Sequence, residues 1–453
     1  MPRRIANGMN FTNPAQATAC DEAVRYANVL LESMGAVQRA IGAAEPESPA
    51  LTWRRSGLWA LTGVPARASG WMCPVALTSA ADGVLLALDA LAPGDRLGAI
   101  RGSLLLAERA RLLGLVRNGR LSANGTCRLM EACDGRVALN LARPSDWELV
   151  PLLIDGPCVA GDWTAVERGL ARGRIIQLTG LARELGLPLG VGRRLPATPI
   201  LPRLAWSTGT SNERRPPRVI ELASLWAGPL AGALLAELGA DVLKIESAGR
   251  LDGARGGHPG FFDLLNEKKR MLTFELQDAG EVAVLDALLQ TADIVIEGSR
   301  PRALEQIGID RHRHVSRGAI WISITAHADP QRVGFGDDAG VEAGLATLMD
   351  EAWGEPVFVG DAIADPLTGL HSALAAWAAW QAQERRWIPM SLSGTTAFAI
   401  SQVTHAAGVE LQNWQRIAEA DCRPLSPLRR PQRRASAAGA HNRELPQLLL
   451  SSA

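Results

Sequence analysis

The hydrophobic positions in the second half of the chain fall into short apolar runs separated by longer stretches with helical spacing. The runs are rich in Val and Ile, as buried strands are, and occupy residues 219–223, 241–246, 293–298 and 319–325. Residues 228–239 are predicted to form a helix with Pro229 in its first turn and Gly239 at its end. Strands that alternate with helices indicate a parallel, doubly wound sheet.

The first half of the chain has a different pattern. Residues 51–200 carry many Leu and Ala at helical spacing and one strand-like run, GRVALNLA. A polar, charged and proline-rich stretch at residues 206–218 is typical of a linker between the two halves. Residues 1–50 are mixed in character and show one candidate helix, at about residues 21–43.

A weak internal repeat connects the two halves. The segment SGLWALTG…ADGVLLALDAL (56–91) resembles AGLATLMD…PLTGLHSALAAW (343–377). Gly57 pairs with Gly344 (344 − 57 = 287), and Gly83 pairs with Gly369 (369 − 83 = 286). Helices made of Ala, Leu and Gly also resemble one another by chance, so the repeat alone is only suggestive.

Composition excludes several classes of partner. The chain has 453 residues, of which 47% are hydrophobic and 21% charged, so it is expected to be globular, with a large core. Lys and Arg total 47, as do Asp and Glu, so no net charge draws the chain to nucleic acid or anionic membranes. No apolar run reaches membrane-spanning length, and the basic N-terminus lacks the apolar core of a signal peptide.

The six cysteines contain no Cys-x-x-Cys pair, and no cluster of His lies beside them. Neither a metal site nor a disulfide framework is therefore expected. Reduced thiols favour a cytoplasmic location.

The chain contains several candidate catalytic motifs. The turn at residues 227–232 reads AGPLAG rather than G-x-G-x-x-G, which argues against a dinucleotide site. No G-x-S-x-G elbow occurs, and His371 is expected to be a buried, satisfied histidine. A cluster of acids could be either a solvated surface or a site with a nucleophilic carboxylate, and helix capping would also explain some of them. Its members are Asp337, Asp338, Glu342, Asp361 and Asp365.

Four ordered blocks carry a resemblance to a known family: VIELASLWAGPLAGALLAELGADVLKIE, FFDLLNEKKRMLTFEL, TADIVIEGSRPRALEQIGID and AIWISIT. They resemble the N-terminal part of the class III CoA-transferases, the family of formyl-CoA:oxalate and carnitine CoA-transferases. The resemblance implies an α/β fold, in which a Rossmann-like large domain with a parallel sheet is joined to a smaller α/β domain. It also implies a homodimer, because two chains of this family interlock.

The order of the segments departs from that family. The blocks CRLMEACDGRVALNLARPSDWELVPLLI and ARGRIIQLTGLARELGLPLGV resemble the small domain, which in ordinary members follows the catalytic half and here precedes it. The early repeat is then a degenerate copy, in which Ser79 stands where Asp365 should. The expected division is an N-terminal helical region (1–50), the degenerate copy (51–120), the small domain (121–200), a linker (201–217) and the CoA-transferase domain (218–453).

The resemblance also implies a chemistry. The family's nucleophilic aspartate lies four residues before a glycine that begins a helix, which points to Asp365 and Gly369 and leaves Asp361 as a loop acid. The substrates would be an acyl-CoA and a carboxylic acid, with the CoA thioester as substrate and no separate cofactor. Backbone N–H groups near Gly369 would stabilise the carbonyl oxygens.

Contacts to CoA are implied for the turn after the first strand, for the end of the second strand and for the loop after IVIE. Gly298 and Ser299 replace the usual Asn-Phe, and Gln306 stands where an arginine is often found. Lys268 is equally compatible with a phosphate contact and with an ordinary solvated charge. The implied contact residues are Leu225, Trp226, Ala227, Lys244, Gly298 and Ser299.

Two other functions stay open. A 2-methylacyl-CoA racemase shares the fold, but racemases place a His immediately before the acid at the position of Asp338, and here that neighbour is Asp337. A catalytically weak CoA-binding protein is the second alternative, because several usual contact residues are replaced.

Overall fold

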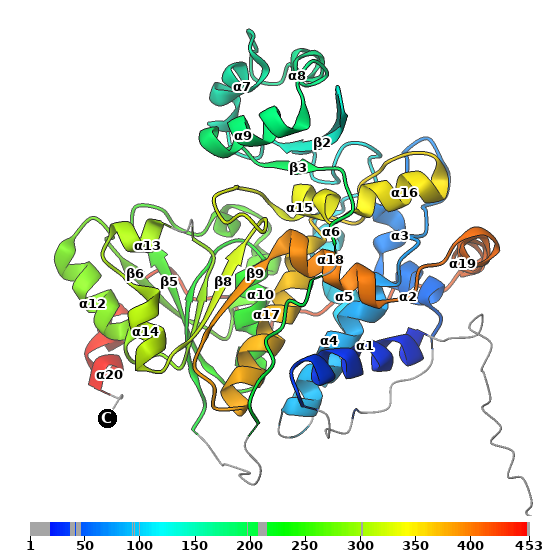
Figure 1. Cartoon of the computed structure of the whole chain (residues 1–453). Helices are drawn as coiled ribbons and strands as arrows, with labels where there is room; N and C mark the ends of the chain where they lie inside the picture. Colours follow the sequence, from blue (N-terminus) through cyan, green and yellow to red (C-terminus); the bar gives the residue numbers. More distant parts are fainter. Residues whose placement is uncertain are drawn as a thin grey trace, which may run out of the picture.

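The computed structural model of the chain describes residues 19–36, 41, 47–92, 94, 96–98, 100–196, 198–206, 215–299 and 302–450. The middle of the expected linker and most of the N-terminal region lie outside these residues. A six-stranded sheet occupies one side of the body, helices from both halves of the chain occupy the other, and a small domain stands above them (Figure 1).

All strands of the large sheet are parallel, and the first of them, β4, lies at its centre. The chain adds β5 and β6 on one side of β4 and then returns to add β7, β8 and β9 on the other. The doubly wound sheet predicted from the sequence is therefore confirmed, and its switch point lies between β4 and β7. The strands are β4 (Arg218–Leu222), β5 (Asp241–Ser247), β6 (Arg270–Phe274), β7 (Ile294–Glu297), β8 (Ile320–Thr325) and β9 (Trp387–Ser391).

Helices cover both faces of this sheet, which explains why its central strands are apolar at consecutive positions. Ile220 and the residues that share its face of the sheet on neighbouring strands pack against one helical layer. Val219 and the residues on the opposite face of the sheet pack against α10 and α17. The first layer contains α12 (Ala279–Leu289), α14 (Arg311–Arg317) and α20 (Leu445–Leu450). The second contains α10 (Ala227–Glu237) and α17 (Ala364–Gln381), with α11 (Pro259–Asn266) beside α10.

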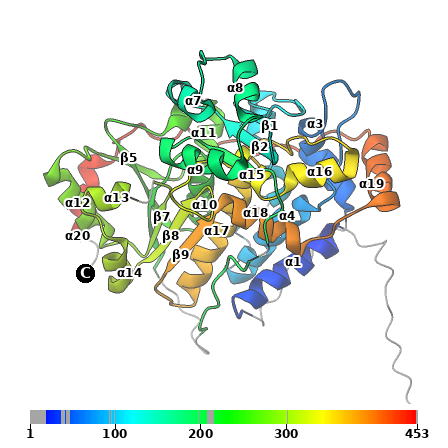
Figure 2. The same cartoon turned by 45° about the horizontal axis from the view of Figure 1, so that its top comes forward.

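The helices of the first half join the core of the second half. Helix α4 packs along α17, and α1 packs along α4 (Figures 1 and 2). The indole Nε1 of Trp377 donates a hydrogen bond to the carbonyl oxygen of Leu91, at 3.2 Å. The helices of the first half are therefore packing partners of the second half. They are α1 (Ala19–Ser33), α2 (Pro49–Ser56), α3 (Leu58–Leu61), α4 (Leu77–Leu91), α5 (Gly102–Leu105) and α6 (Glu108–Leu113).

Four further helices of the second half complete this side of the body. They are α15 (Gly336–Glu342), α16 (Leu345–Trp353), α18 (Leu392–Gln402) and α19 (Gly408–Ala420). The indole Nε1 of Trp353 donates to the carbonyl oxygen of Met72, at 3.0 Å, so this side is also joined to the first half. Within the described residues, no helix is both long and apolar enough to cross a membrane.

The small domain has an antiparallel sheet and a hydrophobic core of its own. Its sheet lies against α15, and a Cβ atom added at Gly190 would approach the carbonyl oxygen of Asp338 to 2.1 Å. This close approach needs glycine and places the small domain directly above the acid cluster. The domain consists of β1 (Cys127–Ala132), β2 (Gly135–Asn140), β3 (Leu189–Val191), α7 (Asp146–Ile154), α8 (Trp163–Leu170) and α9 (Ile175–Leu185).

Candidate active site

Asp365 lies in the first turn of α17, facing the start of α15. The backbone N–H of Gly336 hydrogen-bonds to its carboxylate, and a Cβ atom at Gly336 would lie only 2.4 Å from Oδ2 of Asp365. Glycine is therefore needed where α15 meets the carboxylate. Of the five clustered acids, Asp365 alone keeps part of its residue surface exposed, although its carboxyl group is surrounded by protein.

The other four acids of the cluster are buried. Burial raises the pKa of Asp365 to about 7; the positive charge of Arg109 opposes this, and the charges of Asp338 and Asp361 add to it. Burial also raises the pKa of Asp337, with a further contribution from Asp361. Several carboxylates in one site cannot all ionise easily, so Asp365 is held close to the point where it gains or loses a proton near neutral pH.

Arg109, from α6 of the first half, is the cation that pairs with Asp361 in this cluster. Its Nε and Nη2 donate to the two carboxylate oxygens of Asp361 at 2.8 and 2.5 Å. Its guanidinium carbon also lies 5.0 Å from the ring centre of Trp226, which packs edge-on against Phe261. Arg109 thereby joins the turn after β4 to the acids around Asp365. No motif in the sequence marks this residue.

Asp361 is fully enclosed in the turn that precedes α17. Its pairing with Arg109 explains why a charged group is tolerated there, because buried charges need a partner and hydrogen bonds. The sequence analysis left it as a loop acid of capping or unknown role. The contacts show that it holds Arg109 in place.

Gly369 differs from its expected position. Helix α17 begins at Ala364, so Gly369 lies more than one turn inside the helix and does not begin it. A Cβ atom at Gly369 would lie 2.6 Å from the carbonyl oxygen of Ala227 and 3.0 Å from Cβ of Leu230. Gly369 therefore allows α17 to approach α10. The expectation that Gly369 begins the helix is wrong, and the N–H groups around it are already bonded within α17.

The two loops expected to contact CoA lie side by side at the switch point of the sheet. Leu225 is 43% exposed and has a φ of +70°, and its N–H donates to Oδ1 of Asp252 at 2.9 Å. A Cβ atom at Gly298 would lie 3.2 Å from Cβ of Ala223, at the end of the neighbouring strand. Ser299 donates its hydroxyl to Oε1 of Glu297 at 2.7 Å. The structure thus brings Leu225, Trp226 and Ala227 close to Gly298 and Ser299.

Lys244 is not at the surface of this site. Its ammonium is fully buried and contacts Oε1 of Glu221 at 2.8 Å, Oδ2 of Asp252 at 2.9 Å and the carbonyl oxygen of Ala223 at 2.7 Å. The ammonium thus donates two hydrogen bonds, to Glu221 and Ala223, and forms an ion pair with Asp252. The contact between Lys244 and CoA that the sequence suggested does not fit this arrangement; instead Lys244 supports the turn at Leu225 through Asp252.

The neighbouring basic run is also occupied by protein partners. Lys269 is buried against the second oxygen of Glu221, and burial lowers its pKa to about 8. Lys268 is partly exposed and pairs with Glu237. A phosphate contact from Lys268 would have to compete with that ion pair.

His327, in the loop after β8, lies under α15. Its Nε2 is 3.4 Å from Oδ2 of Asp338, and its Nδ1 is 3.3 Å from Oε2 of Glu342. Asn140 of the small domain also donates to Asp338, at 3.3 Å. All these side chains are buried. The group fastens the small domain to α15.

His371 has the structural role expected from the sequence. Burial lowers its pKa to about 4, its Nδ1 lies 2.7 Å from the carbonyl oxygen of Leu367, and its Nε2 lies 2.8 Å from the hydroxyl of Tyr26. The neutral ring therefore connects α1 of the first half to α17 of the second.

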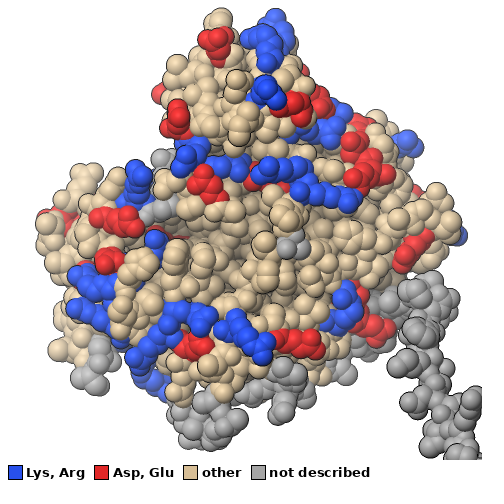
Figure 3. All heavy atoms as spheres, viewed as in Figure 1, with Lys and Arg blue, Asp and Glu red and all other residues tan. Residues whose placement is uncertain are grey.

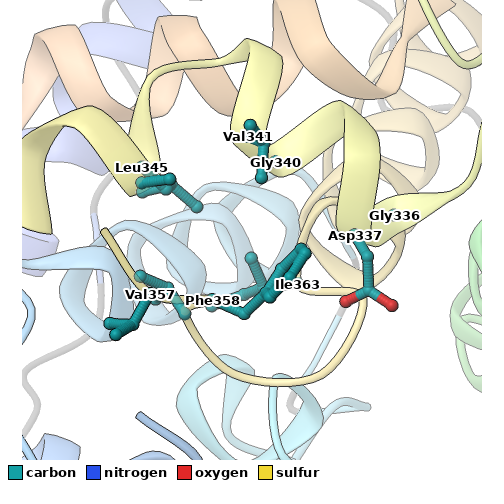
Figure 4. A pocket seen from close by; sticks show the side chains of 10 residues that line it. Gly336, Asp337, Gly340, Val341, Leu345, Val357, Phe358 and Ile363 are labelled. Carbon is teal, nitrogen blue, oxygen red and sulfur yellow. The ribbon is translucent and has the colours of Figure 1, made fainter. Parts of the chain in front are cut away.

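Two hollows are present near these elements. The smaller, in Figure 4, is lined by Asp337 and apolar side chains of α15, α16 and the segment before α17, and its space of about 10 Å³ admits a single water. A groove of about 500 Å³ lies along β1 of the small domain and includes none of the predicted site residues. On the face in Figure 3, charged side chains gather on and beneath the small domain, and the buried acids do not contribute to that pattern.

The described residues contain no group of three or more His, Cys, Asp or Glu side chains arranged to hold a metal ion. The five cysteines whose side chains are described are free thiols.

Comparison with known proteins finds similar sequences for the second half of the chain. Residues 217–407 match CoA-transferase family III. A succinate–glutarate CoA-transferase from Agrobacterium fabrum is 34% identical over 191 residues, which are 37% of this chain and 47% of that protein. A succinyl-CoA–D-citramalate CoA-transferase from Chloroflexus aurantiacus is 28% identical over 38% of this chain and 48% of its own length. The chain thus spans about half the length of the curated relatives it matches.

Solved structures match over a similar extent. A CAIB/BAIF family protein from Brucella suis has 27% sequence identity and a TM-score of 0.36, with 47% of this chain and 58% of that chain covered. The assignment of the fold comes from the sheet and helices described above.

Proposed function

Residues 217–407 belong to CoA-transferase family III, and from this premise we propose that the protein moves CoA between an acyl-CoA thioester and a carboxylic acid through Asp365. The observation that carries the proposal is the environment of Asp365. It is the least buried member of the carboxylate cluster, and with a pKa of about 7 roughly half of it is still ionised at neutral pH. A nucleophile needs both properties.

The reaction requires only groups that the protein and its substrates supply. The Asp365 carboxylate attacks the thioester carbonyl, the carbon–sulfur bond breaks, and a mixed anhydride and the CoA thiolate result. The thiolate then attacks the aspartyl carbonyl, which releases the donor carboxylate and leaves an aspartyl-CoA thioester. An acceptor carboxylate attacks that thioester, and the same two steps in reverse give the new acyl-CoA and free Asp365. Covalent catalysis divides one difficult exchange into easier steps.

The oxyanions formed in these steps need hydrogen-bond donors. The N–H of Gly336 already reaches the Asp365 carboxylate. At the start of α17 the N–H of Asp365 donates to the carbonyl oxygen of Ala362, that of Leu367 donates to Ile363, and Pro366 has no N–H. Gly336 is therefore the donor proposed for this role.

The binding site for CoA is proposed at the carboxyl ends of β4 and β7, because open α/β sheets bind ligands at the switch point. Leu225, Trp226, Ala227, Gly298 and Ser299 would line it. Arg109 and Trp226 connect this place to Asp361, close to the proposed nucleophile. A cytoplasmic location and a homodimer, both expected from the sequence, are further parts of the proposal, and free cysteines agree with the first.

The racemase alternative gains no support from the geometry. A histidine does face Asp338, but His327 is fully buried and both of its ring nitrogens point to carboxylates. An acid/base pair that acts on the two faces of an α-carbon must be open to the substrate.

The experiment is incubation of the purified protein with acyl-CoA donors and a panel of carboxylic acids, followed by mass spectrometry of the CoA products. Succinyl-CoA is the first donor to test, because relatives are named for reactions of succinate and succinyl-CoA. Transfer that is lost in Asp365→Asn and kept in Asp350→Asn, a surface control, supports the proposal. Racemisation without transfer, or CoA binding without any reaction, would reject it.

A further inference from the structure

The weak repeat in the sequence is a real repeat of helical structure. Gly57 separates α2 from α3 with a φ of +102°, and Gly344 separates α15 from α16 with a φ of +108°. These are the two glycines that the sequence pairs. Only glycine adopts such angles easily, so in both places a glycine with positive φ ends one helix before the next begins.

The helix pairs α1–α4 and α10–α17 also correspond. A Cβ atom at Gly83 would lie 2.6 Å from the carbonyl oxygen of Ala23 and 3.1 Å from Cβ of Tyr26. At Gly369 the same atom would lie 2.6 Å from the carbonyl oxygen of Ala227 and 3.0 Å from Cβ of Leu230. Both glycines therefore contact the same positions, three residues apart, on their partner helices.

The ends of α1 and α10 match as well. Met34-Gly35-Ala36 follows α1 and Leu238-Gly239-Ala240 follows α10, and both glycines have positive φ, +78° and +96°. Residues 34–48 separate α1 from α2, whereas β5 to β8 lie between α10 and α15. Helices α1, α2, α3 and α4 thus repeat the order of α10, α15, α16 and α17.

The copy cannot form a second active site. Ser79, 286 residues before Asp365 (365 − 79 = 286), is fully buried in α4, and its hydroxyl has no hydrogen-bond partner. The copy instead packs α4 against α17, the helix that carries Asp365.

We propose that this reduced copy completes the active site within the same chain, and that Arg109 is the positioning residue it contributes. The inference rests on the proposed function, because it assigns a role to Arg109 in the chemistry of Asp365. Arg109 follows α4 and α5 in the copy and reaches across to the second half through the two hydrogen bonds to Asp361 and the contact with Trp226.

The role of Arg109 follows from the charges around Asp365. Asp338 faces it from α15, Asp361 faces it from the preceding turn, and Arg109 faces it from α6. Asp337, also on α15, lies beside Asp361 and Arg109. Without the cation, the uncompensated charge of Asp361 would oppose ionisation of Asp365. Each unit by which the pKa of Asp365 rises above neutral pH lowers the fraction of nucleophilic carboxylate about tenfold.

The first test compares pH–rate profiles of Arg109→Gln, Arg109→Lys and Arg111→Gln. Arg111 is a matched control on the same helix, because it donates to the backbone carbonyls of Ser56 and Ser426. We expect the rising limb of Arg109→Gln to move about one pH unit or more to the alkaline side. Arg109→Lys should recover part of this shift, and Arg111→Gln should show none. An unchanged profile in a folded Arg109→Gln variant would overturn the proposal.

A double variant separates charge from folding. Arg109→Gln combined with Asp361→Asn removes both members of the ion pair. We expect the rising limb of the pH–rate profile of this double variant to return towards that of the wild type. A loss of activity with no such return would show that Arg109 is only structural.

The second test asks whether the site is completed within one chain. Asp365→Asn and Arg109→Gln chains, carrying different tags, are co-expressed and any mixed oligomer is purified. If the copy serves its own chain, mixing restores no activity, and failure of the chains to associate has the same meaning. Restored activity would show that Arg109 reaches the site of another chain and would overturn the proposal.

A readout independent of turnover separates this inference from the proposed function. Carbodiimide labelling of Asp365, measured by mass spectrometry against pH, reports its protonation without any substrate. If the wild type transfers no CoA but labelling still shifts in Arg109→Gln, the proposed function fails while the role of Arg109 stands. If transfer occurs and labelling does not shift in Arg109→Gln, the proposed function stands while the role of Arg109 fails.

Discussion

The guanidinium of Arg109 donates two hydrogen bonds to the carboxylate of Asp361, 252 residues later in the chain. Asp361 is fully buried, and four residues after it comes Asp365, the proposed nucleophile. The pair thus joins the first half of the molecule to the turn that precedes α17. Its energetic consequences can be tested separately from catalysis.

Asp361→Asn should destabilise the protein by about 3–5 kcal/mol, because it leaves the largely buried Arg109 without its charged partner. Denaturant unfolding measures the change. Asp350→Asn removes a partly exposed carboxylate, paired with Arg136, and should cost about 1 kcal/mol or less. Equal effects of the two substitutions would contradict the importance of the Arg109–Asp361 pair.

Asp365→Asn should stabilise the protein at alkaline pH. The pKa of Asp365 is raised in the folded state to about 7, above its unfolded value, so the folded wild type loses stability as pH rises from about 4 to about 7. The asparagine cannot ionise, so the gain should be near zero at about pH 4 and reach roughly 1–3 kcal/mol above about pH 8. Thermal unfolding across this range measures it. A gain that is independent of pH would argue against a raised pKa.

Gly369→Ala should weaken the contact between α17 and α10, since the new methyl group would meet the carbonyl oxygen of Ala227 at 2.6 Å. We expect a loss of about 1–3 kcal/mol from the strain in a packed core. Gly180→Ala in α9 is the matched control, because nothing lies within 4 Å of its added Cβ. That control should stabilise its helix by up to about 1 kcal/mol. A neutral Gly369→Ala would show that the two helices can separate easily.

Lys244→Met should destabilise the protein by about 3–5 kcal/mol, because Glu221 and Asp252 lose a shared buried cation. Asp252 accepts from the N–H of Leu225, so affinity for CoA should fall indirectly. Lys268→Met, at a partly exposed ion pair, should cost about 1 kcal/mol or less. Weaker CoA binding in Lys244→Met without loss of stability would favour direct contact between Lys244 and CoA.

The apolar runs of the central strands were readable from the sequence because both faces of these strands are buried. β9 was not, since its positions alternate between exposed and buried and it contains Pro389. Proline in a sheet is restricted to edge strands and strand starts, and β9 lies at the edge.

The sequence was unevenly informative about the candidate site, for physical reasons. Asp365 could be proposed because the resemblance places the nucleophile four residues before a glycine, a spacing that is local in sequence. Lys244 was placed at the ligand because the sequence does not show that Glu221 lies directly beside it in the parallel register. Arg109 gave no signal, because its helix is short and its partner is distant along the chain.

The measurement that tests the central claim most directly is the identity of the residue acylated during turnover. The protein is incubated with acyl-CoA, trapped with hydroxylamine, digested and sequenced by mass spectrometry, in the wild type and in Asp361→Asn. The account predicts a hydroxamate at Asp365 in both proteins and none in Asp365→Asn. An adduct at Asp361, or full transferase activity in Asp365→Asn, would contradict it.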